Sequence, residues 1–165
     1  MNILWIIVVI ILAASVLNGR KKGCVRTLLE LLAKVVVIAI VIMIVPFITS
    51  FIMEKKIMDQ PEFVVRAASF VVTFFILFAI AQAIIGAFDV LAKLPLVKGV
   101  NRFLGLFAGF FEGIVSVWIF FTIVAAISKT ALGFFFLMMI EESPFLNYIY
   151  EHNLILQILS DFGVL

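Results

Sequence analysis

Long apolar runs separated by short charged stretches fill most of the chain and predict helices that cross a membrane. We place four such helices at about residues 3–18, 27–53, 64–88 and 100–128. A helix rises 1.5 Å per residue, so about 20 residues cover a hydrocarbon core of about 30 Å. The first run is short for this task, and we expect its polar ends to lie in thinned interfaces. The basic residues that follow it at 20–22 favour a retained helix over a cleaved signal peptide.

The residues that follow the fourth run predict helices too short to span. Residues 131–140 form an apolar patch of ten residues, which suits an interfacial or re-entrant segment. Ser143 and Pro144 then supply a helix cap and a first-turn proline. Residues 145–159 mix aromatic, aliphatic and polar side chains, as a helix on a membrane surface does.

Composition places the whole chain in the same class. Apolar residues make up 66% of it and charged residues 13%, with a mean hydropathy of +1.35. A soluble domain of this size has no interior large enough for so much apolar surface. The single Cys24 excludes an internal disulfide. We therefore predict an all-α integral membrane protein, with one membrane domain over residues 1–165, four transmembrane helices and a C-terminal interfacial helical segment over about 131–165.

Basic residues cluster in two of the connections and orient the predicted helices. The first connection holds Arg20, Lys21, Lys22, Arg26 and Lys34 against Glu30, and the third holds Lys93, Lys98 and Arg102 against Asp89. Because short cytoplasmic loops carry an excess of Lys and Arg, we expect both connections to be cytoplasmic. Both termini then lie outside, in a multi-pass arrangement.

Glycines at four-residue spacing mark the fourth predicted helix. At 100° per residue, one face within roughly 100° collects Gly105, Gly109, Glu112, Gly113 and Ser116. Such a face packs against another helix, and a charge on it needs a protein or water partner.

The third predicted helix offers a small-residue stripe that is one candidate to receive this glycine face. The stripe consists of Ala79, Ala83 and Gly86, beside the strongly polar Gln82. The alternative is that these small residues face lipid.

Two motifs resemble those of the colicin V production protein (CvpA) family of small bacterial inner-membrane proteins. The first is a basic turn after the first helix that contains Gly19, Arg20, Gly23 and Arg26. The second begins at Asn101 and Arg102 and continues through Gly105, Gly109 and Gly113. The similarity covers about residues 3–128, and residues 143–159 resemble the family's usual tail. It implies the bacterial inner membrane and a role in bacteriocin production and envelope physiology. In some bacteria a similar module is fused to an extracytoplasmic serine protease, which suggests an anchor or regulator.

One position departs from the family pattern. Glu112 stands where the family often has Arg or Lys, so a partner of the opposite sign is expected. Lys34 is our candidate, because it lies at a similar depth from the cytoplasmic side. Glu30 competes for Lys34 at the favourable i, i+4 spacing.

The chain offers little of the chemistry that an enzyme needs. His152 is the only histidine, and no nucleophile motif or metal-ligand spacing is present. We predict no catalytic residue, no metal, no cofactor and no nucleic-acid partner. The basic first connection is either a topology signal, which we favour, or a site for anionic headgroups.

Two function classes remain. The first is a non-enzymatic accessory or scaffold protein whose partners are the lipid bilayer and either a second copy or a membrane or secretion protein. The alternative is a small channel or transporter with a polar path lined by Glu112, Gln82 and Ser116. A conduction path usually needs polar groups at several depths, and this lining is sparse, so we favour the scaffold.

Overall fold

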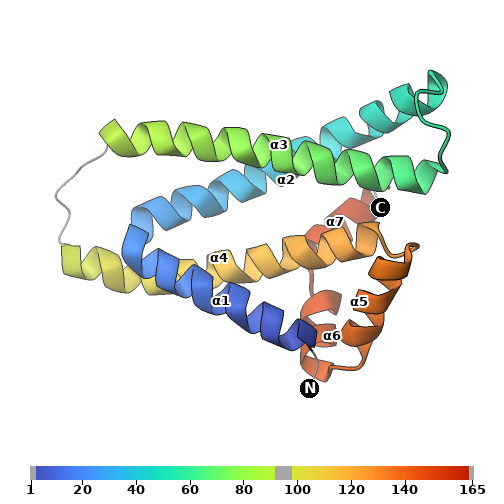
Figure 1. The fold of residues 1–165 in the computed structure, drawn as a ribbon. Helices are drawn as coiled ribbons and strands as arrows, with labels where there is room; N and C mark the ends of the chain where they lie inside the picture. Colours follow the sequence, from blue (N-terminus) through green and yellow to red (C-terminus); the bar gives the residue numbers. More distant parts are fainter. Residues whose placement is uncertain (1–2, 92–97, 164–165) are drawn as a thin grey trace.

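The computed structural model describes residues 3–91 and 98–163, and helices account for all regular secondary structure in these ranges (Figure 1). In chain order they are α1 (Ile3–Lys22), α2 (Cys24–Glu54), α3 (Glu62–Leu91), α4 (Lys98–Ala126), α5 (Ala131–Glu141), α6 (Pro144–Glu151) and α7 (Leu154–Asp161). The first four are long and apolar enough to cross a membrane. The all-α class and the four predicted spans are therefore confirmed as helices of sufficient length and hydropathy.

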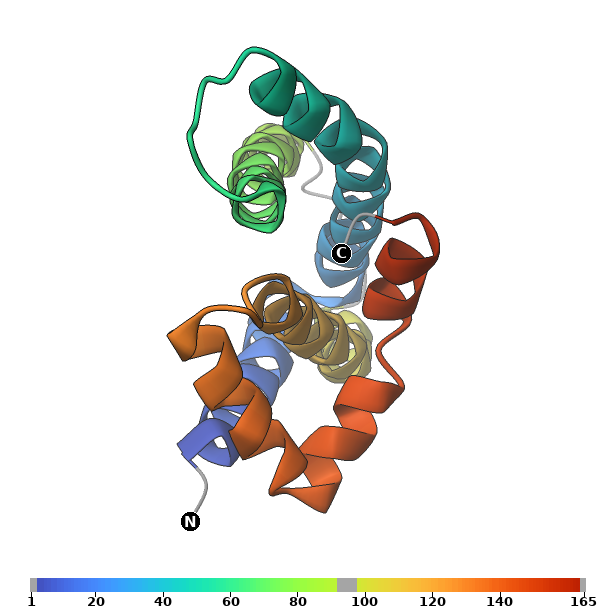
Figure 2. The ribbon, with the colours of Figure 1, turned by 90° about the vertical axis from the view of Figure 1, so that its right-hand side faces the viewer.

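Helix α4 is the central element of the fold. It packs along α1, contacts α2, and receives α7 near its end. Helix α3 packs mainly on α2, so that Figure 2 shows an α2–α3 pair beside a group formed by α1, α4 and the short tail helices. Two apolar cores hold these helices together, and the first of them crosses between the two groups. One joins α2, α3, α4 and α7 around Val41, Phe70 and Leu159, and the other joins α1, α4, α5 and α6 around Leu4, Phe121 and others.

The first connection is much tighter than the predicted basic turn. Helix α1 runs on to Lys22, past the end predicted near residue 18, and α2 begins at Cys24. Basic side chains suit the last turn of a helix, where they face the negative end of its dipole, so Arg20 and its neighbours extend α1. The direction change falls on Gly23, whose φ of +88° is readily adopted only by glycine.

The other spans agree with prediction to within a few residues. Pro46 lies inside α2, which continues past it to Glu54. The connection predicted between the third and fourth helices falls largely on residues 92–97, which lie outside the described residues. On either side of it, α3 ends at Leu91 and α4 begins at Lys98.

The tail forms three short helices instead of two. Ser143 caps α6 by accepting a hydrogen bond from the backbone N–H of Leu146 at 3.5 Å, and Pro144 occupies the first turn, as predicted. The single helix predicted over residues 145–159 is wrong, because the chain breaks at Asn153. The Asn153 side chain accepts from the N–H groups of Ile155 and Leu156 and so starts a new helix, α7.

Asn153 also fastens the tail to α4. Its amide donates to the carbonyl oxygen of Trp118 at 2.9 Å and to Thr122 Oγ1 at 3.2 Å. Asn153 and Thr122 are both fully buried. The tail therefore packs against the long helices, with Ile155 and Leu159 in the first core.

Candidate functional site

The glycines of the two motifs face each other across the contact between α1 and α4. A Cβ atom added at Gly19 would overlap the carbonyl oxygen of Gly105, and one added at Gly105 would overlap that of Gly19. A Cβ added at Gly109 would lie 2.5 Å from the carbonyl oxygen of Ser15 on α1. Backbone therefore meets backbone, which is what four-residue glycine spacing permits.

The glycine face does not pack on α3, so the proposed role of the α3 stripe is wrong. Ala79 and Ala83 are exposed, and a Cβ added at Gly86 would meet nothing within 4 Å. The physical reason is that α1 carries its own glycine, Gly19, in a helical turn that sequence patterning assigned to a loop. Two glycine surfaces approach more closely than a glycine surface and an alanine stripe, and α3 is occupied by α2.

Asn101, which opens the second motif, completes the turn of the first. Its side-chain oxygen accepts a hydrogen bond from the backbone N–H of Cys24 at 2.9 Å. That N–H belongs to the first turn of α2 and has no partner within its own helix. A Cβ at Gly23 would run into the Asn101 side chain, so the close fit needs glycine as well as the positive φ. Thr27 closes the same turn by donating from Oγ1 to the Gly23 carbonyl at 2.8 Å.

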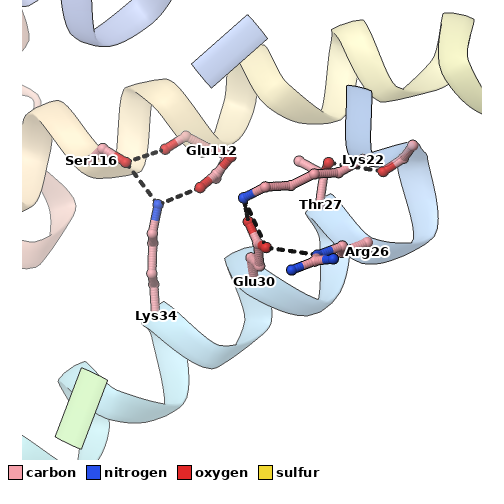
Figure 3. A network of polar contacts seen from close by, with 8 residues as sticks. Lys22, Arg26, Thr27, Glu30, Lys34, Glu112 and Ser116 are labelled. Atoms are coloured by element: carbon pink, nitrogen blue, oxygen red, sulfur yellow. Dashed lines mark hydrogen bonds and ion pairs between the residues drawn. The ribbon is translucent and has the colours of Figure 1, made fainter. Parts of the chain in front are cut away.

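Lys34 and Glu112 form a buried ion pair between α2 and α4 (Figure 3). The Lys34 ammonium lies 2.6 Å from Glu112 Oε1 and 2.8 Å from Ser116 Oγ. Ser116 in turn donates to the backbone carbonyl of Glu112 at 2.8 Å. The side chains of Lys34 and Glu112 are only 8% and 10% exposed. The contact expected from their similar depth is present.

Glu30 does not compete for Lys34, because the Glu30 carboxylate is already bonded to two other basic side chains. The Glu30 carboxylate accepts from Lys22 Nζ at 2.6 and 2.9 Å and from Arg26 Nε at 3.2 Å (Figure 3). The reversal at Gly23 folds the end of α1 back toward the first turns of α2, which brings Lys22 to Glu30. The Glu30 side chain is 3% exposed, so this second cluster also removes its carboxylate from solvent.

The remaining predicted residues lie outside these two clusters. Arg20 and Arg102 are exposed on α1 and α4, and Gln82 is half-buried on α3 and takes no part in the bonds of Lys34 and Glu112. Sequence reasoning missed Asn153. An asparagine immediately before an apolar run is an ordinary helix-start signal, and that signal was available.

The arrangement as a whole can hold helices together and neutralise charge. Ammonium and carboxylate groups satisfy one another, and glycines set the spacing of α1 and α4. Within the described ranges no group of three or more His, Cys, Asp or Glu side chains could hold a metal ion. His152 is exposed, with its ring stacked on Tyr148 at 4.1 Å between centroids.

A family model described as "Colicin V production protein" matches residues 5–153, which is most of the chain. The chain belongs to the colicin V production protein family. The match includes both motifs and reaches Asn153, so the resemblance carried by the motifs is confirmed. A search of curated proteins and a search of solved structures each gave no match. In this member of the colicin V production protein family, the two motifs form one site, because the first supplies Gly19 and Gly23 and the second supplies Gly105 and Asn101 against them.

Proposed function

We propose that this protein is a non-enzymatic accessory or scaffold protein of the bacterial inner membrane that acts in bacteriocin production or secretion and in envelope homeostasis. Family membership suggests a role in colicin V production. The four long apolar helices suggest a multi-pass membrane protein. The scaffold role is our own step beyond these two statements.

The observation that supports a scaffold is the internal pairing of the charges within the helices. Lys34 and Glu112 are both nearly buried and lie 2.6 Å apart. Placing a charged side chain within the bilayer costs free energy unless the charge is hydrated or paired with an opposite charge. Here the ion pair joins α2 to α4. The same residues therefore act as a clamp between helices, and the glycine contact of α1 with α4 adds a second one.

The arrangement of the ends supports the predicted orientation. The N-terminus and the tail helices lie at the end where α2 connects to α3, and the Gly23 turn lies toward the other end (Figure 1). Arg20, Lys21 and Lys22 belong to that turn, so positive charge favours its cytoplasmic placement. Both termini then face the outside. An alkaline phosphatase fusion after residue 165 should be active and a green fluorescent protein fusion dark; the reverse pattern contradicts the orientation.

Crosslinking in the membrane tests the scaffold role. A photo-crosslinking amino acid at an exposed position of α3, such as Ile76 or Ala83, should capture a discrete protein partner or a second copy. In a strain that makes a bacteriocin, the yield of this crosslink should fall in the Glu112→Ala variant, because the loss of the ion pair weakens the contact between α2 and α4. Bacteriocin export that is unchanged when the protein is deleted would contradict the proposed role.

The channel or transporter alternative places conduction at Glu112. In the described conformation the Glu112 side chain is paired with Lys34 and 10% exposed, which supports a structural role for it over a conducting one. Flux through liposomes separates the two functions. Solute or ion flux that depends on the protein and is lost in Glu112→Gln would favour a transporter over the scaffold, and flux that this variant leaves unaltered removes the residue from any such path.

A further inference from the structure

A cleft with a charged mouth opens where α3 begins and α4 ends, the end that faces the viewer in Figure 2. The mouth has a volume of about 420 Å³, and its polar lining consists of Glu62, Arg66, Ser128 and Lys129. It lies at the end opposite the Gly23 turn and shares no residue with the Lys34–Glu112 site.

An apolar groove continues from this mouth along the first part of α3, beside the end of α4 and the turn that follows it. It has a volume of about 370 Å³ and is lined by Val64, Ala68, Val71, Val72 and Ile127, among others. The mouth and the groove share Phe63, Ala67 and Ala126, so the two volumes adjoin. Each volume lies within the range of about 300–1,000 Å³ that small-molecule sites occupy. A charged mouth over an apolar groove matches an amphiphile better than a soluble ion.

Two cations at the mouth keep donors available for an anion. Arg66 donates from Nη2 to Glu62 at 2.5 Å and from Nη1 to the carbonyl oxygen of Gly163 at 2.5 Å. A guanidinium carries five N–H donors, so these two bonds hold its orientation and leave three. Lys129 Nζ lies 5.0 Å from the centre of the Phe63 ring, a contact that leaves its N–H groups open to a ligand.

The charges at the mouth sum to one positive charge. Among the described residues that line the mouth, Arg66 and Lys129 are opposed by Glu62 alone, which is already bound to Arg66. A single phosphodiester anion would neutralise this excess. A zwitterionic headgroup brings a further cation, for which the described lining of the mouth offers no unpaired carboxylate.

We propose that this cleft binds one anionic phospholipid, with its phosphate between Arg66 and Lys129 and one acyl chain in the groove along the start of α3, beside the end of α4. The proposal rests on the membrane placement proposed above, because only then does the groove face acyl chains. The mouth lies near the ends of two spanning helices, which is the level at which phospholipid headgroups are found.

The test uses the full chain in a neutral detergent, with native mass spectrometry to count bound lipid. We expect one phosphatidylglycerol per chain at concentrations where phosphatidylcholine does not bind. Each Lys or Arg near an anionic headgroup contributes about fivefold, so Arg66→Gln with Lys129→Gln should weaken binding about 25-fold. Lys55→Gln with Lys56→Gln is the matched control, because these exposed lysines lie at the same end but outside the cleft. Equal losses in the two double variants would show general surface attraction and overturn the proposal.

The groove has its own pair of variants. Ala68→Phe fills it from an exposed position, whereas Ala79→Phe adds the same ring at an exposed position on α3 outside the groove. We expect Ala68→Phe to weaken phosphatidylglycerol binding about tenfold and Ala79→Phe to leave it unchanged. Glycerol phosphate that competes as well as the lipid would show a soluble-phosphate site and overturn the proposal.

Carbonate extraction of native membranes separates this inference from the proposed function. If the protein is extracted, the membrane placement itself fails. If it stays in the membrane but binds phosphatidylglycerol and phosphatidylcholine equally, the lipid site alone fails.

Discussion

The buried Lys34–Glu112 pair gives the sharpest prediction, because removing one charge leaves the other without a partner. At 2.6 Å and an effective dielectric constant of about 20, the attraction between the two charges is about 6 kcal/mol. Desolvation of both groups offsets most of it. Breaking such a pair on one side typically costs about 3–5 kcal/mol, since a buried charge remains. We therefore expect Glu112→Ala to lower the unfolding free energy by about that amount.

The double variant and a neighbouring hydroxyl separate the ion pair from simple loss of packing. Lys34→Met with Glu112→Leu removes both charges and keeps most of the volume, so it should lie within about 1–2 kcal/mol of the wild type. Ser116→Ala removes the hydroxyl that accepts from Lys34, and it should cost only about 1 kcal/mol. The wild type, the double variant and Ser116→Ala should thus lie within about 1–2 kcal/mol of one another, with Glu112→Ala far below them.

The assay is reversible unfolding of the purified full chain in mixed detergent micelles as the fraction of a denaturing detergent increases. Fluorescence of Trp118, which lies on α4 beside α7, reports the transition when Trp5 is replaced by Phe in every variant. A loss of 3–5 kcal/mol changes the unfolding equilibrium constant by about two to four orders of magnitude. If Glu112→Ala unfolds with the wild type, or if the double variant loses the sum of the two single losses, the two charges are not coupled and the clamp is refuted.

Three further predictions concern the packing and the tail. Gly105→Leu should separate α1 from α4 and abolish a disulfide engineered between their facing positions, whereas Gly86→Leu should leave it intact; equal effects of the two changes would contradict the glycine contact. Asn153→Ala should lower stability by about 1–3 kcal/mol and expose the tail to limited proteolysis, because it removes a helix cap and two bonds to α4. Burial, and then the charge of Glu141, raise the pKa of Tyr150, so absorbance at 295 nm in a Tyr148→Phe protein should show ionisation above the ordinary value of about 10. Because the folded state favours the neutral phenol of Tyr150, the contribution of this group to stability is complete below about pH 10 and is lost as the pH rises through the raised pKa. Titration of the phenol at its ordinary pKa would show that it is solvated and would contradict the prediction.

The sequence pattern predicted correctly those features that depend on a single helix. Residue counts from the basic ends placed Lys34 and Glu112 at similar depth, and helical periodicity put Glu112 on the glycine face. The partner of that face is a property of two helices, and two small-residue surfaces were available. Gly19 was part of a recognised motif, but its neighbours Arg20 and Lys21 suggested a loop, so its place on α1 was missed.

The Glu30 cluster and Asn153 show the same limit. The pairing of Glu30 with Lys22 depends on the direction change at Gly23, which a local pattern does not reveal. Asn153 caps a helix by a local rule, but its bonds to Trp118 and Thr122 join residues more than 30 positions apart. Such contacts follow from the packing of the tail, which periodicity alone leaves open.

The clamp between α2 and α4 also sets an order of events during synthesis. Lys34 and Glu112 are separated by 78 positions, and Asn101 reaches Cys24 across 77. At about 5–20 residues per second, the ribosome adds Glu112 about 4–16 s after it adds Lys34. During that interval the Lys34 ammonium group lacks its carboxylate partner and the first turn of α2 lacks the Asn101 cap. The insertion machinery or neighbouring headgroups must then solvate or pair these groups. The fold is therefore completed only when its fourth helix arrives, and a nascent chain that stops before Glu112 should be a preferred substrate for membrane proteases.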